Sequence, residues 1–80
     1  MSAGDAVTRR RNIVKSLIRN MQITDEGWTF DDALRFIVKS YGHGIRDSTA
    51  TNILRQLERH KVIYRKRGLL YAKKTRNVDQ

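Results

Sequence analysis

The segment from residue 47 to residue 63 has the clearest periodicity in the chain. Apolar side chains recur there at intervals of three and four residues, which places them on one face of an α-helix: Ala50, Ile53, Leu54 and Leu57. Asp47 and Ser48 precede this stripe, and their side-chain oxygens are suited to accept hydrogen bonds from the amides of a first helical turn. The sequence therefore predicts a helix over about Ser48–His60 with one buried face.

The opposite face of this predicted helix is polar and positively charged. The residues across from the apolar stripe, or next to that position, are Ser48, Thr51, Asn52, Arg55, Gln56 and Arg59. Arg can form two hydrogen bonds with guanine, Asn and Gln can do so with adenine, and Ser or Thr can bond a base or a phosphate. A solvated amphipathic helix has the same pattern, so this face alone does not decide between the two interpretations.

The net charge of the chain favours a polyanionic partner. Its 80 residues, enough for one domain, include 17 Lys and Arg against 8 Asp and Glu, which gives a formal charge of +9. Charges of one sign repel one another in a compact state, so the excess is best explained by binding to nucleic acid first and to an anionic membrane second. Arg9, Arg10, Arg11, Lys15 and Arg19 make the N-terminal region basic, either as a solvated helix surface or as phosphate contacts.

The chain lacks the patterns that most enzymes and metal sites require. It has no cysteine, its two histidines have no suitable carboxylate spacing, and it has no glycine-rich phosphate loop. No apolar run is long enough to span a membrane, and no secretory signal is visible. We therefore expect a protein that is not an enzyme, with no cofactor, metal, small-molecule ligand or membrane contact. We expect it inside a cell, in the cytoplasm or nucleoid, in a host cell or in the nucleus.

Two helices are predicted before residue 47. The first covers about residues 5–21, and its apolar face includes Val7. The second covers about residues 30–40, with Phe36 at the edge of its apolar stripe and four side chains pointing inward: Ala33, Leu34, Ile37 and Val38. Residues 28–30 favour a short strand, while Thr29 and Asp32 resemble a capping box. Gly42 is suited to end the second helix in the left-handed conformation.

After His60 the periodicity changes from helical to extended. Residues 62–65 and 69–73 are rich in β-formers, and a loop of Lys66, Arg67 and Gly68 separates them. We expect a hairpin with a type I turn and a bulge at Gly68, with Tyr64 and Tyr71 packed against the helices. Residues 5–73 would form the domain, between flexible termini at residues 1–4 and 74–80.

This order of elements resembles a winged helix-turn-helix domain. The closest local match is Leu54-x-x-Leu57-Glu58-x-x-x-Val62-Ile63, which is similar to the junction of third helix and wing in many bacterial and archaeal winged-helix regulators. Many of those proteins have Gly where this chain has Lys61. The resemblance covers about residues 5–73 and implies an α+β fold that is mainly α, with three helices, a short strand and a C-terminal β-hairpin wing.

The resemblance also implies binding to double-stranded DNA, with the third helix in the major groove and the wing, Arg65–Gly68, on the backbone or minor groove. Carried over position by position, the implied DNA contacts are Ser48, Thr49, Thr51, Asn52, Arg55, Gln56, Arg59, Arg65, Lys66 and Arg67. We expect a small transcriptional regulator, with a possible homodimer contact at Val7 or Phe36. The alternatives are a protein-interaction module of a larger assembly, or an accessory protein that binds RNA or single strands and stacks bases on aromatic side chains.

Overall fold

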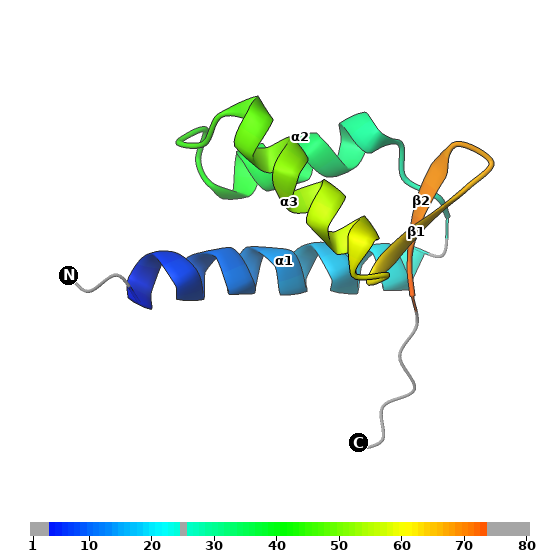
Figure 1. Ribbon diagram of the computed structural model, residues 1–80, viewed down its shortest axis with the longest axis horizontal. Helices are drawn as coiled ribbons and strands as arrows, with labels where there is room; N and C mark the ends of the chain where they lie inside the picture. The colour runs from blue at the N-terminus through cyan, green and yellow to red at the C-terminus, as the bar shows by residue number, and fades with distance from the viewer. Residues whose placement is uncertain (1–3, 25, 74–80) are drawn as a thin grey trace, which may run out of the picture.

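The computed structural model describes residues 4–24 and 26–73, and within them it has three helices followed by a two-stranded antiparallel sheet. The elements in chain order are α1 (Gly4–Thr24), α2 (Phe30–Ser40), α3 (Asp47–Arg59), β1 (Ile63–Lys66) and β2 (Leu69–Ala72) (Figure 1). The expected α+β class with mainly helical content is confirmed. The predicted flexible ends lie outside the described residues, except for Gly4, which begins α1.

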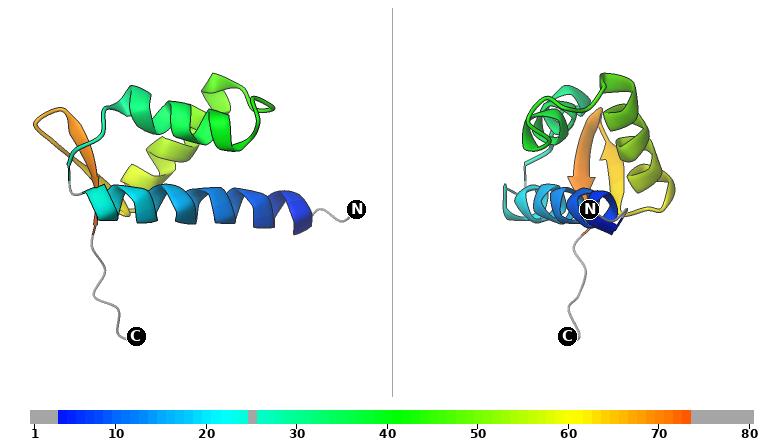
Figure 2. Two further views of the ribbon diagram at one scale, coloured as in Figure 1. Left: turned by 180° about the vertical axis from the view of Figure 1, so that it is seen from behind. Right: turned by 90° about the vertical axis from the view of Figure 1, so that its left-hand side faces the viewer.

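One buried apolar cluster joins all five elements. Helices α2 and α3 lie on the same side of α1, and the hairpin stands near the C-terminal end of α1 (Figures 1 and 2). The largest fully buried side chains come from all of these elements: Leu17, Ile37, Leu54, Ile63 and Leu70. Full burial of such a side chain contributes about 1.5–3 kcal/mol. The four predicted inward residues of α2 belong to this cluster or pack against it, whereas Val7 of α1 is 58% exposed.

Both ends of α2 lie where the sequence predicted them. The Thr29 hydroxyl accepts a hydrogen bond from the Asp32 amide at 3.0 Å and caps the N-terminus. At the other end, Gly42 has a φ of 68°. Its amide donates to the Lys39 carbonyl at 2.9 Å, and the His43 amide donates to the Val38 carbonyl at 3.0 Å. This pair of bonds is a Schellman motif, which satisfies carbonyls that the helix leaves free.

The predicted side-chain cap of α3 is wrong. Arg46 is the N-cap residue, in extended conformation, and it makes no side-chain capping bond, while Asp47 is already the first helical residue. The Asp47 carboxylate is favourably placed in the first turn, near the positive end of the α3 dipole. At the C-terminus, Lys61 has a φ of 62°, and amides of Lys61 and Val62 close a second Schellman motif on the carbonyls of Glu58 and Leu57. Lys61 therefore adopts the conformation for which glycine is usual.

The hairpin loop is one residue shorter than predicted. Lys66 pairs with Leu69, so only Arg67 and Gly68 connect the strands, with φ values of 55° and 79°. Two positive φ values are characteristic of a type I′ turn, whose twist matches that of the strands better than a type I turn does. The strand expected at residues 28–30 is reduced to one bridge, in which the amides and carbonyls of Trp28 and Leu70 exchange hydrogen bonds of 2.9 and 2.7 Å.

Tyr64 and Tyr71 lie on the hairpin face that points away from the core, so the expectation that they pack against the helices is wrong. Side chains alternate between the two faces of a strand, and the core-facing positions belong to Ile63, Leu70 and Ala72. Tyr64 is 45% exposed and pairs across the ladder with the half-buried Tyr71. Their rings stack with centroids 5.6 Å apart and planes inclined by 18°.

Gly27 lies so close to the hairpin that no room is left for a Cβ atom. A Cβ atom there would clash with the Leu69 Cβ atom and would lie 2.9 Å from the Tyr71 Cζ atom. We predict that Gly27→Ala lowers the free energy of unfolding by about 1–3 kcal/mol, because the hairpin must move to make room. Urea denaturation would measure this change, with Gly44→Ala as the control, since a Cβ at Gly44 meets only the Tyr41 carbonyl oxygen, at 3.4 Å. Equal stability of the two variants would contradict the prediction.

The backbone conformation of Lys61 gives a second prediction. A left-handed conformation costs a residue with a Cβ atom about 1–2 kcal/mol, a cost that glycine avoids. Glycine, however, loses more conformational entropy on folding, and this loss cancels part of the gain. Lys61→Gly should therefore raise the free energy of unfolding by about 0.5–1 kcal/mol. Lys61→Ala keeps the Cβ atom and should give no such gain. The prediction fails if thermal and urea unfolding show the same gain for both variants.

Candidate nucleic-acid interface

The outward side of α3 presents four exposed polar side chains, here called the α3 face: Ser48, Asn52, Arg55 and Arg59. Burial of Ala50, Ile53 and Leu54 on the opposite side of the helix fixes this orientation. Within the described part of the chain, none of the four side chains forms a hydrogen bond or an ion pair. Their donors and acceptors are available to a molecule that binds this surface.

The three remaining predicted contacts on α3 lie on its flanks. Thr49 is exposed and lines a surface pocket of about 440 Å³ between α1 and α3. Gln56 is on the same flank, and its Oε1 atom accepts a hydrogen bond from the Arg10 Nη2 atom at 3.0 Å. Thr51 is half-buried on the other flank. The structure thus brings four of the seven predicted α3 residues together on one open face, and it engages Gln56 with α1.

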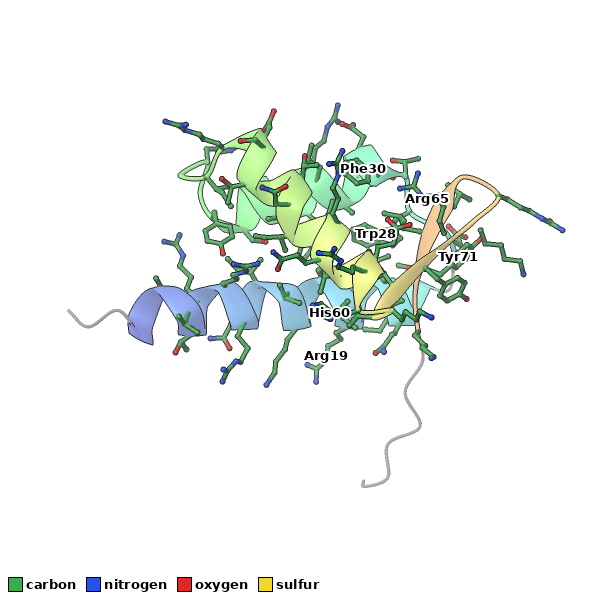
Figure 3. All side chains as sticks on the ribbon, viewed as in Figure 1. Arg19, Trp28, Phe30, His60, Arg65 and Tyr71 are labelled. Atoms are coloured by element: carbon green, nitrogen blue, oxygen red, sulfur yellow. The ribbon has the colours of Figure 1, made fainter. Side chains whose placement is uncertain are left out.

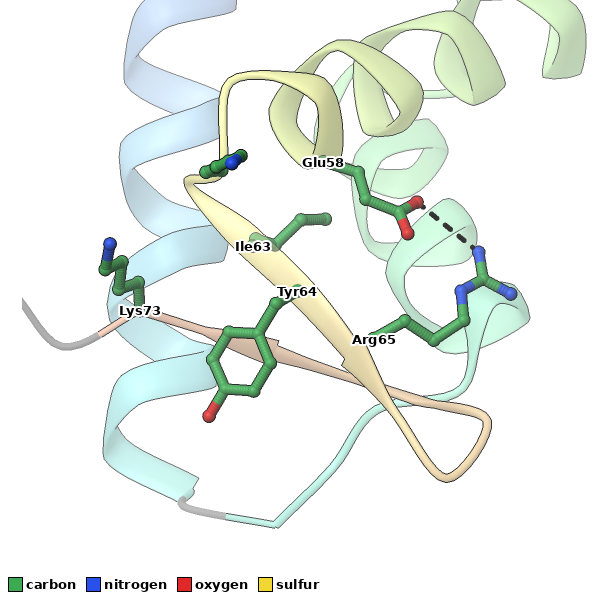
Figure 4. Close-up of a pocket in the computed structure, with 6 residues that line it drawn as sticks. Glu58, Ile63, Tyr64, Arg65 and Lys73 are labelled. Carbon is green, nitrogen blue, oxygen red and sulfur yellow. Dashed lines mark hydrogen bonds and ion pairs between the residues drawn. The ribbon is translucent and has the colours of Figure 1, made fainter.

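Of the three predicted wing residues, two are exposed to solvent without a partner in the described part of the chain, and one contacts α3. Lys66 and Arg67 are exposed beside and within the turn of the hairpin. Arg65 instead turns back toward α3, where its Nη2 atom lies 3.4 Å from the Glu58 Oε1 atom (Figure 4) and its guanidinium lies 6.0 Å from the Phe30 ring centroid. Both members of this ion pair are partly exposed, so it stabilises the fold by at most about 1 kcal/mol. The Glu58 carboxylate nonetheless offsets the positive charge of Arg65.

The basic residues of α1 have two different environments. The Arg9 Nη2 atom donates to the Tyr41 carbonyl at 3.0 Å, and its guanidinium lies 5.2 Å from the Tyr41 ring centroid. Arg9 therefore connects α1 to the C-cap residue of α2, and Arg10 connects α1 to α3. Arg11, Lys15 and Arg19 are exposed, and Arg19 points away from the body of the molecule (Figure 3).

Sequence reasoning missed a second cationic cluster at the base of the hairpin. Lys61, Tyr64 and Lys73 line a surface pocket of about 440 Å³ together with Glu58, Ile63 and Arg65 (Figure 4), here called the hairpin-base pocket. The signal in the sequence was the alternation of Ile63, Tyr64 and Arg65, which turns Tyr64 outward once Ile63 is assigned to the core. Three successive β-formers, Val62 to Tyr64, made that assignment ambiguous.

Metal sites and membrane-spanning helices are both missing from the described residues. No group of three or more His, Asp or Glu side chains in residues 4–24 and 26–73 is placed to hold a metal ion. None of the helices described is both long and apolar enough to cross a bilayer.

Comparison with family models, curated proteins and solved structures found no match to this chain.

The α3 face should be dispensable for folding. Asn52→Ala and Arg55→Ala remove exposed side chains with no intramolecular partner among the described residues, so each should change the free energy of unfolding by less than about 0.5 kcal/mol. Ile53→Ala, on the buried side of the same helix, should cost about 2–5 kcal/mol. Urea denaturation of the three variants measures the difference. A large loss of stability in either polar variant would show that the α3 face has a structural role.

Proposed function

We propose that the chain is a winged helix-turn-helix domain that binds double-stranded DNA. Three features of the fold support this assignment. A short turn, residues 41–46, connects α2 to α3, and the hairpin follows α3 directly. Trp28 bridges β2 on the edge opposite β1, which extends the hairpin toward a third strand. In this assignment the hairpin formed by β1 and β2 is the wing.

The unpartnered α3 face is the observation that carries the proposal. An α-helix fits the major groove of B-DNA, where base edges present hydrogen-bonding groups. Arg55 and Asn52 have the side chains that form paired hydrogen bonds with guanine and adenine, and both are exposed near the middle of α3. Ser48 and Arg59, toward the two ends of the helix, would contact phosphates and fix the register of the helix on the duplex.

The hairpin would add contacts beside the groove. Lys66 and Arg67 are exposed at its turn, where they would reach the phosphate backbone or the minor groove. The net charge of +9 would bring the protein to DNA before the base contacts form. A small transcriptional regulator that works this way would gain affinity from a second copy. Val7 is the better of the two proposed dimer contacts, because Phe36 is half-buried, with its ring centroid 5.8 Å from that of Trp28.

Binding to duplexes tests the proposal directly. A sequence selected from a random pool and an unselected duplex would be compared by fluorescence anisotropy over a salt series. Arg55→Ala should cost about 1–3 kcal/mol of discrimination at one base pair, because a paired contact with a base edge is lost. Lys66→Ala should weaken binding to every sequence alike and lower the salt slope by about one.

Arg35→Ala is the control for the loss of one positive charge. Arg35 is on α2, where it forms a 3.0 Å ion pair with Asp31, and its removal should leave sequence preference unchanged. The absence of duplex binding at low salt would contradict DNA binding and favour a protein-interaction module. A sequence preference that survives both Asn52→Ala and Arg55→Ala would contradict recognition through α3.

A further inference from the structure

The proposed duplex contacts make no use of the hairpin-base pocket, although an exposed aromatic ring lies there among cations. Tyr64 is 45% exposed, and Lys61 and Lys73 line the same pocket (Figure 4). The volume of about 440 Å³ falls within the range of sites for small molecules. An aromatic face beside ammonium groups has the chemistry that binds a nucleotide, because the ring stacks on the base and the cations attract the phosphate.

The ring of Tyr64 is supported on one side by a second aromatic ring. One of its faces stacks on Tyr71, with the two planes inclined by only 18°. Tyr71 is in turn backed by the loop at Gly27, where an added Cβ atom would lie 2.9 Å from the Tyr71 Cζ atom. A base that stacks on the other face of Tyr64 therefore meets a surface that is already ordered, which lowers the entropic cost of binding.

The charges in the pocket favour an anion. Its one carboxylate, on Glu58, is paired with Arg65, and in Figure 4 this pair lies away from the Tyr64 ring. No acidic side chain of the described residues forms an ion pair with Lys61 or Lys73. Lys73 follows β2 directly, and its backbone is held in place because the Gln22 Nε2 atom donates to the Lys73 carbonyl at 3.1 Å.

The backbone of Lys61 is an independent observation. Glycine would adopt this φ of 62° at a lower conformational free energy, yet the chain has a lysine at this position. Backbone strain of this kind is found more often at functional sites, where a side chain is needed in a conformation that it does not favour. Here the strained residue lines the same pocket as the exposed tyrosine.

We propose that the hairpin-base pocket binds an unpaired nucleotide of a DNA strand, with its base stacked on Tyr64 and its phosphate between Lys61 and Lys73. This inference rests on the proposed function, because the pocket adjoins the C-terminal end of α3, which would lie on the duplex. The preferred ligand is then a duplex with a single-stranded extension, and the same duplex with blunt ends binds more weakly.

Anisotropy with three labelled DNA ligands tests the inference: a blunt duplex, the same duplex with a short single-stranded extension, and the single strand alone. We expect the parent protein to bind the extended duplex roughly 10-fold more tightly than the blunt one, since stacking on an aromatic ring has an effect of this size. Tyr64→Ala should abolish this preference and leave blunt-duplex affinity unchanged. Tyr64→Phe keeps the ring and should retain the preference, while Lys61→Gly should reduce it even though it stabilises the fold.

The outcomes separate the two proposals. Equal affinity of the parent protein for blunt and extended duplexes overturns the nucleotide site and leaves the proposed duplex binding intact. The nucleotide site is overturned as well if Tyr64→Ala, shown to be folded by its thermal unfolding, keeps the preference. If the blunt duplex does not bind but the single strand binds in a Tyr64-dependent way, the site stands and the proposed duplex binding fails.

Discussion

Burial of one apolar cluster determines which surfaces of this small protein remain polar. Each helix and the hairpin contribute one face to the cluster, and side chains such as Leu17, Ile37 and Leu54 are almost completely removed from solvent. A chain of 80 residues has little other means of offsetting the conformational entropy of folding and the repulsion among its positive charges. Because Ile53 and Leu54 must face inward, Asn52 and Arg55 must face outward. The α3 face is thus a consequence of the core.

The turns of the protein show a second constraint. Among the described residues, those other than glycine with positive φ are His43, Lys61 and Arg67, one in each of the three segments that connect α2, α3, β1 and β2. Such conformations cost a residue with a Cβ atom about 1–2 kcal/mol each. Lys61 and Arg67 lie at the base and the tip of the hairpin. Glycine at these two positions would avoid the strain, but the proposed wing would then lose a positive charge at each end.

The sequence predicted the helices well because their apolar stripes are regular. The bounds of α2 were correct, and the stripe of α3 placed its polar face on the right side. The errors arose where several residues suit one role. Asp47 and Ser48 both suit the N-cap of α3, although Arg46 occupies that position, and Lys66 can join either the loop or the ladder. In such places the backbone geometry decides, and it is set by the packing of the whole fold.

The candidate site could be predicted only in part. The outward residues of α3 follow from its periodicity, but contacts between distant segments do not. The hydrogen bond between Arg10 and Gln56 joins residues 46 positions apart, and the orientation of Arg65 depends on where Glu58 and Phe30 lie in space. The prediction that Tyr64 packs against the helices is wrong, because a shift of one residue along a strand exchanges the inner face for the outer one.

The most direct test of DNA recognition through α3 is a titration of the isotopically labelled protein with a DNA duplex, followed by amide NMR shifts. If α3 lies in the groove and the hairpin beside it, the largest shifts will map to the α3 face and to Lys66 and Arg67. The exposed side of α2 around Arg35 will change little. Shifts that are centred on another surface, or that are absent at low salt, would contradict the proposal that this chain recognises DNA through α3.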